Sequence, residues 1–170
     1  MDLEQALCGD KLRNELLSYP TVNPFSVAEL FRLLDGEVSS EADLADIDRL
    51  CFSVVSDLCQ SKLLIDMQSD DKRVVWYDYL GLQVYLFLQG KGKYTDKSAA
   101  TGIISVAIMT ELADHVCTYC KITSDLLPLI VGLLLSVAGK ITADAWCDYF
   151  YQTKIATNHL LEERLTQEIE

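Results

Sequence analysis

Apolar residues recur every three or four positions along much of the chain, the period of an α-helix that buries one face. The clearest pattern predicts a helix over residues 40–60, opened by a serine cap. Its apolar stripe consists of Leu44, Ile47, Leu50, Cys51, Val54, Val55 and Leu58. Weaker patterns predict helices over 3–18 and 26–35. The second of these opens with a Ser-x-x-Glu capping box at Ser26.

The C-terminal half is also helical in its pattern. We expect helices over 98–120 and 126–138, and a last helix that starts at Thr142 and continues to about residue 165. Gly139 is expected to end the second of these, because glycine favours the left-handed conformation that closes many helices. The polar chain end, 162–170, is expected to fray.

Between these halves the period changes. Residues 62–67 and 73–79 are rich in β-branched or aromatic side chains, and they flank a polar turn-forming cluster at 68–72. This arrangement predicts a β-hairpin. Residues 80–89 are almost wholly apolar, and periodicity alone does not separate a buried helix from a strand there; we favour a helix.

These elements predict a mainly α fold: a helical bundle around the 124–138 helix, with one small β-hairpin. Three helices followed by a hairpin is also the element order of a winged helix-turn-helix domain, so the N-terminal part is expected to be winged-helix-like. The length of 170 residues predicts a single domain, 1–170. Residues 1–89 and 98–165 are candidate subdomains on either side of the basic loop 90–97.

The composition is acidic, with 26 Asp and Glu against 14 Lys and Arg and a formal net charge of −12. Residues 1–90 carry 16 acids and 7 bases, a net −9, whereas residues 91–170 carry 10 and 7, a net −3. Such a charge repels nucleic acids and anionic membranes and steers basic partners toward the protein. Acidity that only maintains solubility is the alternative interpretation.

The expected compartment is the cytoplasm. The first residues, Met1-Asp2-Leu3-Glu4, contain neither the basic nor the apolar region of a secretory signal. The six cysteines are expected to be free, buried thiols in a reducing environment. The apolar run from Leu126 to Ala138 is shorter than the roughly 20 residues of a membrane span, so we interpret it as a core helix.

No motif predicts catalysis, a cofactor or a metal site. The pair Cys117 and Cys120, with His115 beside it, lacks the second ligand pair that a tetrahedral zinc site requires, so two packed thiols on one helix face are expected. Neither His115 nor His159 lies in a hydrolase or nuclease signature. DNA binding is disfavoured because the 40–60 helix, in the recognition position, would bring five acids and one base into the major groove.

The sequence therefore favours a non-enzymatic module that binds a basic protein. Its most concrete form is an immunity or inhibitor protein that neutralises a basic, nuclease-type toxin by occluding the site where the toxin holds phosphate. The predicted partner-binding residues are acids of the 40–60 helix and hairpin tip, and neighbouring aromatics: Glu41, Asp43, Asp46, Asp48, Asp57, Asp70, Asp71, Trp76, Tyr77 and Tyr79. A secretion chaperone with an apolar groove and a winged-helix-like transcription regulator are the alternatives.

Overall fold

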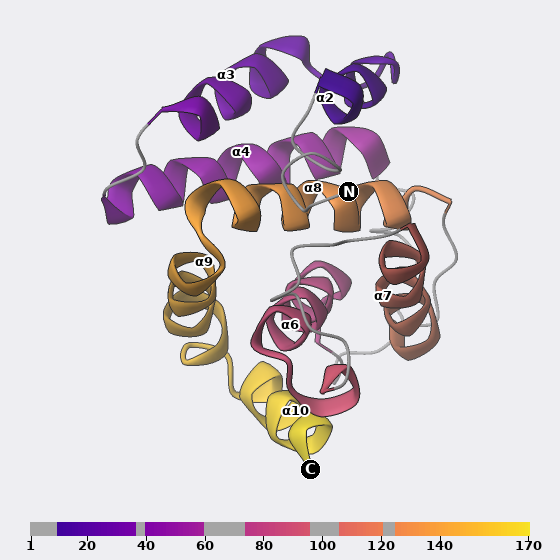
Figure 1. Ribbon diagram of the computed structural model, residues 1–170, viewed down its shortest axis with the longest axis vertical. Coiled ribbons are helices and arrows are strands. Elements are labelled where there is room, and N and C mark those ends of the chain that lie inside the picture. The colour runs from indigo at the N-terminus through magenta and orange to yellow at the C-terminus, as the bar shows by residue number, and fades with distance from the viewer. Residues whose placement is uncertain (1–9, 37–39, 60–73, 96–105, 121–124) are drawn as a thin grey trace.

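A computed structural model describes residues 10–36, 40–59, 74–95, 106–120 and 125–170, and these ranges form a helical bundle without strands (Figure 1). The prediction of a mainly helical bundle is thereby confirmed. The elements in chain order are α2 (Asp10–Leu17), α3 (Pro24–Asp35), α4 (Glu41–Cys59), α6 (Trp76–Gln89), η2 (Gly92–Tyr94), α7 (Val106–Cys120), α8 (Leu127–Ile141), α9 (Ala143–Phe150), the π-helical η4 (Tyr151–Ile155) and α10 (His159–Ile169).

Helices α3 and α4 differ in how well their sequence patterns predicted their ends. Helix α4 agrees with the predicted range to within one residue at each end. Helix α3 begins two residues earlier than the capping box indicated. The side chain of Asn23 accepts a hydrogen bond from the Phe25 amide at 2.9 Å, and Pro24 occupies the first helical position, where its missing N–H costs nothing.

The predicted hairpin is corrected by the structure at its second strand. The first strand, 62–67, and the turn, 68–72, lie outside the described residues. Residues 76–79 open helix α6 instead of forming a strand, and the favoured helix over 80–89 continues it. Nearly all of α6 up to Phe87 is buried, so its aromatic side chains pack around a core helix rather than alternating across a sheet.

Helix α8 lies at the centre of the bundle, where it contacts α3, α4, α6, α7 and α9 (Figure 1). It does not end at Gly139 but continues to Ile141. The chain then turns at Thr142, whose φ of 143° lies outside the helical region. The Thr142 hydroxyl accepts a hydrogen bond from the Ala145 amide at 3.2 Å and so caps the start of α9.

The single last helix expected from Thr142 onward is divided into three parts. Helix α9 passes directly into the π-helical turn η4, and a turn at residues 156–158 then leads to α10. Asn158 caps α10, because its side-chain oxygen accepts hydrogen bonds from the Leu160 and Leu161 amides. The expected fraying at 162–170 is wrong: the helix extends to Ile169, and Leu165 is buried.

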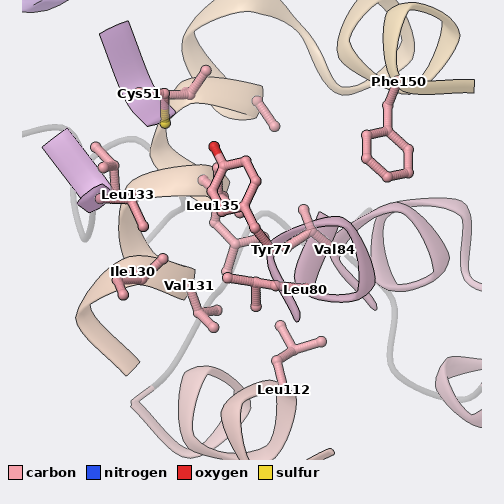
Figure 2. Close-up of a cluster of buried hydrophobic side chains, with 14 of the residues drawn as sticks. Cys51, Tyr77, Leu80, Val84, Leu112, Ile130, Val131, Leu133, Leu135 and Phe150 are labelled. Atoms are coloured by element: carbon pink, nitrogen blue, oxygen red, sulfur yellow. The ribbon is translucent and has the colours of Figure 1, made fainter. Parts of the chain in front are cut away.

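The buried side chains form a hydrophobic cluster that extends from Leu12 to Leu165. Figure 2 shows part of it, with Leu80 and Val84 of α6 facing α8 side chains such as Val131. Close approach of α9 to α6 depends on Gly81, because a Cβ atom at that position would lie 2.5 Å from the Phe150 ring. The fold therefore brings α4, α6, α8 and α9 together around one small space, described next.

Candidate functional site

The acidic residues of α4 do not all share one role. Glu41 and Asp46 are exposed, and Asp43 is half-buried. Asp46 lies 3.7 Å from Arg49, which is itself 68% exposed, so this pair is held only weakly. The N-terminal half of α4 therefore offers an accessible acidic surface formed by Glu41, Asp43 and Asp46.

The two other predicted acids of α4 have partners within the fold. Asp57 accepts a hydrogen bond from the Asn23 backbone N–H at 3.1 Å, which ties α4 to the start of α3. Asp48 lies 3.6 Å from the Lys154 ammonium. Asp57 thus has a structural role that the sequence did not reveal. The predicted hairpin-tip acids, Asp70 and Asp71, lie outside the described residues.

The predicted aromatic contacts are corrected by the structure. Trp76, Tyr77 and Tyr79 are 2%, 8% and 1% exposed, so none of them presents a ring to a partner at the surface. Tyr77 packs edge-on against Phe52 and Trp76, and Tyr79 stacks on Tyr119. These rings are buried because they belong to a central helix and not to the solvent-facing hairpin that the sequence predicted.

A small pocket opens where α4, α6, α8 and α9 meet, with a cavity volume of about 30 Å³. Aliphatic side chains of α4 and α8 form part of its wall. Its aromatic wall consists of Tyr77, Trp146, Tyr149 and Phe150. The Trp146 and Phe150 rings are stacked, with centroids 5.1 Å apart and planes inclined by 7°. This volume holds about one or two water molecules.

The Tyr77 hydroxyl is the polar group buried inside this pocket. It lies beside Cys51 (Figure 2), and both residues line the pocket. The Cys51 thiol adjoins this hydroxyl and forms a hydrogen bond with it, a weak one because a thiol is a poor hydrogen-bonding group. Surrounding protein atoms enclose the hydroxyl oxygen.

The mouth of the pocket is acidic. Asp48 and Asp78 line it together with the single base Lys154. Burial raises the pKa of Asp78; Lys154 opposes this effect, and the carboxylate of Asp48 adds to it. Burial likewise raises the pKa of Tyr149, with further contributions from Asp48 and Glu41. Glu41 therefore lies near this mouth, which links the pocket to the acidic surface of α4.

The pocket does not carry an activated nucleophile. Burial raises the pKa of the Cys51 thiol to about 12, and the Asp48 charge contributes to the rise. Because the thiolate is the reactive form, Cys51 is inert at neutral pH. Cys59 is similarly shielded, since burial raises its pKa to about 11. Neither of these two thiols is therefore activated as a nucleophile.

A second polar cluster, the Glu168 network, lies on the opposite face of α6. Glu168 is 5% exposed and accepts both hydrogen bonds donated by the Gln83 amide, at 2.9 and 3.1 Å. Its carboxylate also lies 2.8 Å from the Lys93 ammonium and 3.3 Å from the Arg164 guanidinium. The Tyr94 hydroxyl donates a hydrogen bond to the side-chain carbonyl oxygen of Gln83 at 2.5 Å.

The electrostatics of the Glu168 network favour the ionised carboxylate. Burial alone would raise the pKa of Glu168, but hydrogen bonds from Lys93 and Gln83 and the charges of Lys93 and Arg164 outweigh it, so the pKa is lowered. The Arg164 guanidinium also lies 4.2 Å from the centre of the Tyr119 ring. The network holds α10 and η2 against α6 and explains why the chain end does not fray.

The residues considered for metal binding lie on α7. Cys120 is buried, Cys117 is half-buried, and the His115 ring contacts the Tyr94 ring edge-on at 5.9 Å. In the described part of the chain, no group of three or more His, Cys, Asp or Glu side chains is placed to hold a metal ion.

Most of the residues that line the pocket were not predictable from the sequence pattern. Asp78 and Lys154 lie 76 positions apart in the sequence, and no local pattern predicts that they line the same pocket. A signal was present in α9: Trp146, Tyr149 and Phe150 recur at three- and four-residue spacing and so share one face. By its pattern alone, this face of α9 does not differ from an ordinary core-facing stripe. Only the acidic residues that lie beside it in the fold distinguish it.

Among the described residues, no single helix is both long and apolar enough to cross a bilayer. Helix α8 and the segment Ala143–Ile155 together have the length and composition of a span, but the chain bends by 112° between them. Comparisons with protein-family models, with curated proteins and with solved structures gave no significant match.

Proposed function

We propose that the protein is a non-enzymatic, acidic module that binds a basic protein, most concretely as an immunity or inhibitor protein for a basic, nuclease-type toxin. The observation that carries this proposal is the accessible acidic surface of α4, formed by Glu41, Asp43 and Asp46. These acids contribute little to packing, because the buried stripe of α4 lies on its other residues.

Charge is the physical basis of the proposed recognition. A nuclease is positively charged where it holds phosphate, so an acidic surface can occupy that site and accelerate encounter. The three acids of this surface lie close together although like charges repel each other. Each like-charged pair at helical spacing costs a few tenths of a kcal/mol. Favourable interaction of Glu41 and Asp43 with the helix dipole offsets part of that cost, but it does not account for Asp46.

The test is a salt series on the association rate with a partner captured from native lysate and then purified. Changing Glu41→Gln, Asp43→Asn and Asp46→Asn together should slow association about tenfold at low salt. The difference should shrink as salt rises, because ions screen exposed charges. A partner with nuclease activity should be inhibited by the wild type.

The matched control removes three exposed acids from α10 and the chain end: Glu162→Gln, Glu163→Gln and Glu170→Gln. Both triple variants lose the same net charge, so an equal effect of the two on the rate would assign recognition to overall charge and contradict the α4 site. Capture of an acidic partner, or a rate insensitive to salt, would contradict the proposal itself.

A further inference from the structure

The junction between α8 and α9 holds a residue in a strained backbone conformation. Thr142 has φ and ψ of 143° and 146°, and it is the one non-glycine residue with a positive φ in the described part of the chain. A side chain branched at Cβ rarely adopts this conformation, which costs free energy and persists only where surrounding contacts enforce it. Packing therefore imposes the bend of 112° between α8 and the segment Ala143–Ile155.

The segment Ala143–Ile155, which consists of α9 and η4, lies between two interruptions of the helical path. Thr142 precedes it, and the turn at residues 156–158 follows it. Helix α9 extends from one end of α8 at the edge of the bundle (Figure 1), where it contacts α4, α6 and α8. The η4 part is π-helical, a rare geometry that occurs frequently at functional sites. The segment can therefore move as a unit without unfolding the helices on either side.

This segment covers the pocket. Trp146 and Phe150 belong to its side of the wall, and aliphatic side chains of α4 and α8 line the facing side. The Phe150 ring packs against Gly81, and the Lys154 ammonium lies 3.6 Å from the Asp48 carboxylate. The two side chains of this ion pair are 32% and 34% exposed, so their attraction contributes little to keeping the segment closed.

We propose that Ala143–Ile155 is a hinged lid, which rotates about Thr142 and uncovers the apolar faces of α4 and α8 that line the pocket. In the closed form, burial of Trp146 and Phe150 holds the lid in place against the strain at Thr142. Opening releases that strain, which lowers the free energy needed to expose the two rings. The lid is independent of the acidic surface of α4 and of the proposed partner.

The test follows the reaction of Cys51 with N-ethylmaleimide in the full chain under native conditions. Cys51 lines the pocket and is 1% exposed, so the reagent reaches it only when the lid opens or the whole chain unfolds. Mass analysis of peptides assigns the label to this residue. We expect labelling at least about tenfold faster than the global unfolding equilibrium allows. The rate should depend little on low urea concentrations, because lid opening exposes little surface.

Substitutions at the hinge separate backbone strain from helix capping. Thr142→Gly should slow labelling of Cys51 about fivefold, because glycine adopts a positive φ readily and the closed form becomes more stable. Thr142→Ala loses the same capping hydroxyl but keeps the strain, so it should not slow labelling. Lys154→Gln removes the ion pair with Asp48 and should accelerate labelling about threefold.

The control for overall stability is Leu16→Ala, which truncates a fully buried side chain of α2 that does not line the pocket. It should lower the free energy of unfolding and leave the labelling rate of Cys51 unchanged. A faster rate in this variant would assign labelling to global unfolding and overturn the lid.

Other outcomes would also overturn the proposal. Labelling of wild-type Cys51 no faster than global unfolding allows would show that the segment does not open by itself. Equal rates in Thr142→Gly and Thr142→Ala would remove the strained hinge. If Thr142→Gly does not fold, as judged by circular dichroism, an unchanged rate in Lys154→Gln overturns the lid, and an accelerated rate supports it.

Discussion

The polar groups on the two faces of α6 differ in how fully they are hydrogen-bonded. On one face, Gln83 is buried within the Glu168 network, where its amide donors and its carbonyl oxygen all have partners. On the other face, the buried Tyr77 hydroxyl has the weakly bonding Cys51 thiol beside it, and burial raises the pKa of Asp78. The same helix thus contributes to a closed network and to an open pocket.

The difference teaches which polar groups serve the fold. The Glu168 network links α6, η2 and α10, and it surrounds one carboxylate with two bases. The pocket places two carboxylates with one base, and its buried hydroxyl has only a weakly bonding thiol beside it. The polar groups of the first face are therefore the ones that contribute most to stability.

The largest expected effect is loss of the Glu168 carboxylate. Glu168→Ala leaves the Gln83 amide without its acceptor and two bases without their partner, and it should lower the free energy of unfolding by about 2–3 kcal/mol. Chemical denaturation measures this. Glu163→Ala, a change of the same type at an exposed position of α10, should have little effect. Equal losses in both variants would contradict the distinction between a network and a surface.

A matched pair of tyrosines compares the two faces directly. Tyr94→Phe leaves the buried carbonyl oxygen of Gln83 without its donor and should cost about 1–2 kcal/mol. Tyr77→Phe removes a hydroxyl that bonds only to the Cys51 thiol, a weak hydrogen-bonding group, and should therefore cost less than Tyr94→Phe. Thermal or chemical unfolding of the two variants provides the comparison. An equal or larger loss in Tyr77→Phe would contradict the difference between the two faces.

The sequence pattern located those elements in which a single buried face repeats over many turns. Helix α4 was predicted to within one residue at each end, because its stripe covers about four turns. Helix α6 was predicted only in part, since a helix buried on all sides has no polar face to reveal its period. Its first residues, Trp76 to Tyr79, therefore resembled a strand.

The candidate site was predictable as a charge pattern but not as a pocket. The exposed acids Glu41 and Asp46 follow from the polar face of α4. The partners of Asp48 and Asp57, by contrast, are Lys154 and the Asn23 amide, which come from other helices and their caps. Such tertiary pairings leave no local signal, so the sequence overestimated the acids available to a partner.

The pH dependence of stability should also distinguish the faces. The pKa of Glu168 is lowered in the folded state, so its contribution is fully present above its unfolded pKa, near 4.3, and is lost as pH falls through the folded value. The stability difference between wild type and Glu168→Gln should be constant above about pH 5.5 and shrink on acidification. Denaturation at several pH values measures it, and a constant difference down to pH 3 would contradict the assignment.

The smallest expected effect concerns Asp78, where the sign is opposite. Burial raises the pKa of this carboxyl, so its ionised form costs stability above its unfolded pKa, and the cost disappears once the group is protonated in both states. Asp78→Asn should therefore raise the free energy of unfolding at pH 7 slightly, because partial exposure and Lys154 limit the cost of the charge. The gain should vanish below about pH 4. Denaturation of this variant beside Asp148→Asn provides the measurement. A loss of stability would mean that attraction to Lys154 outweighs burial.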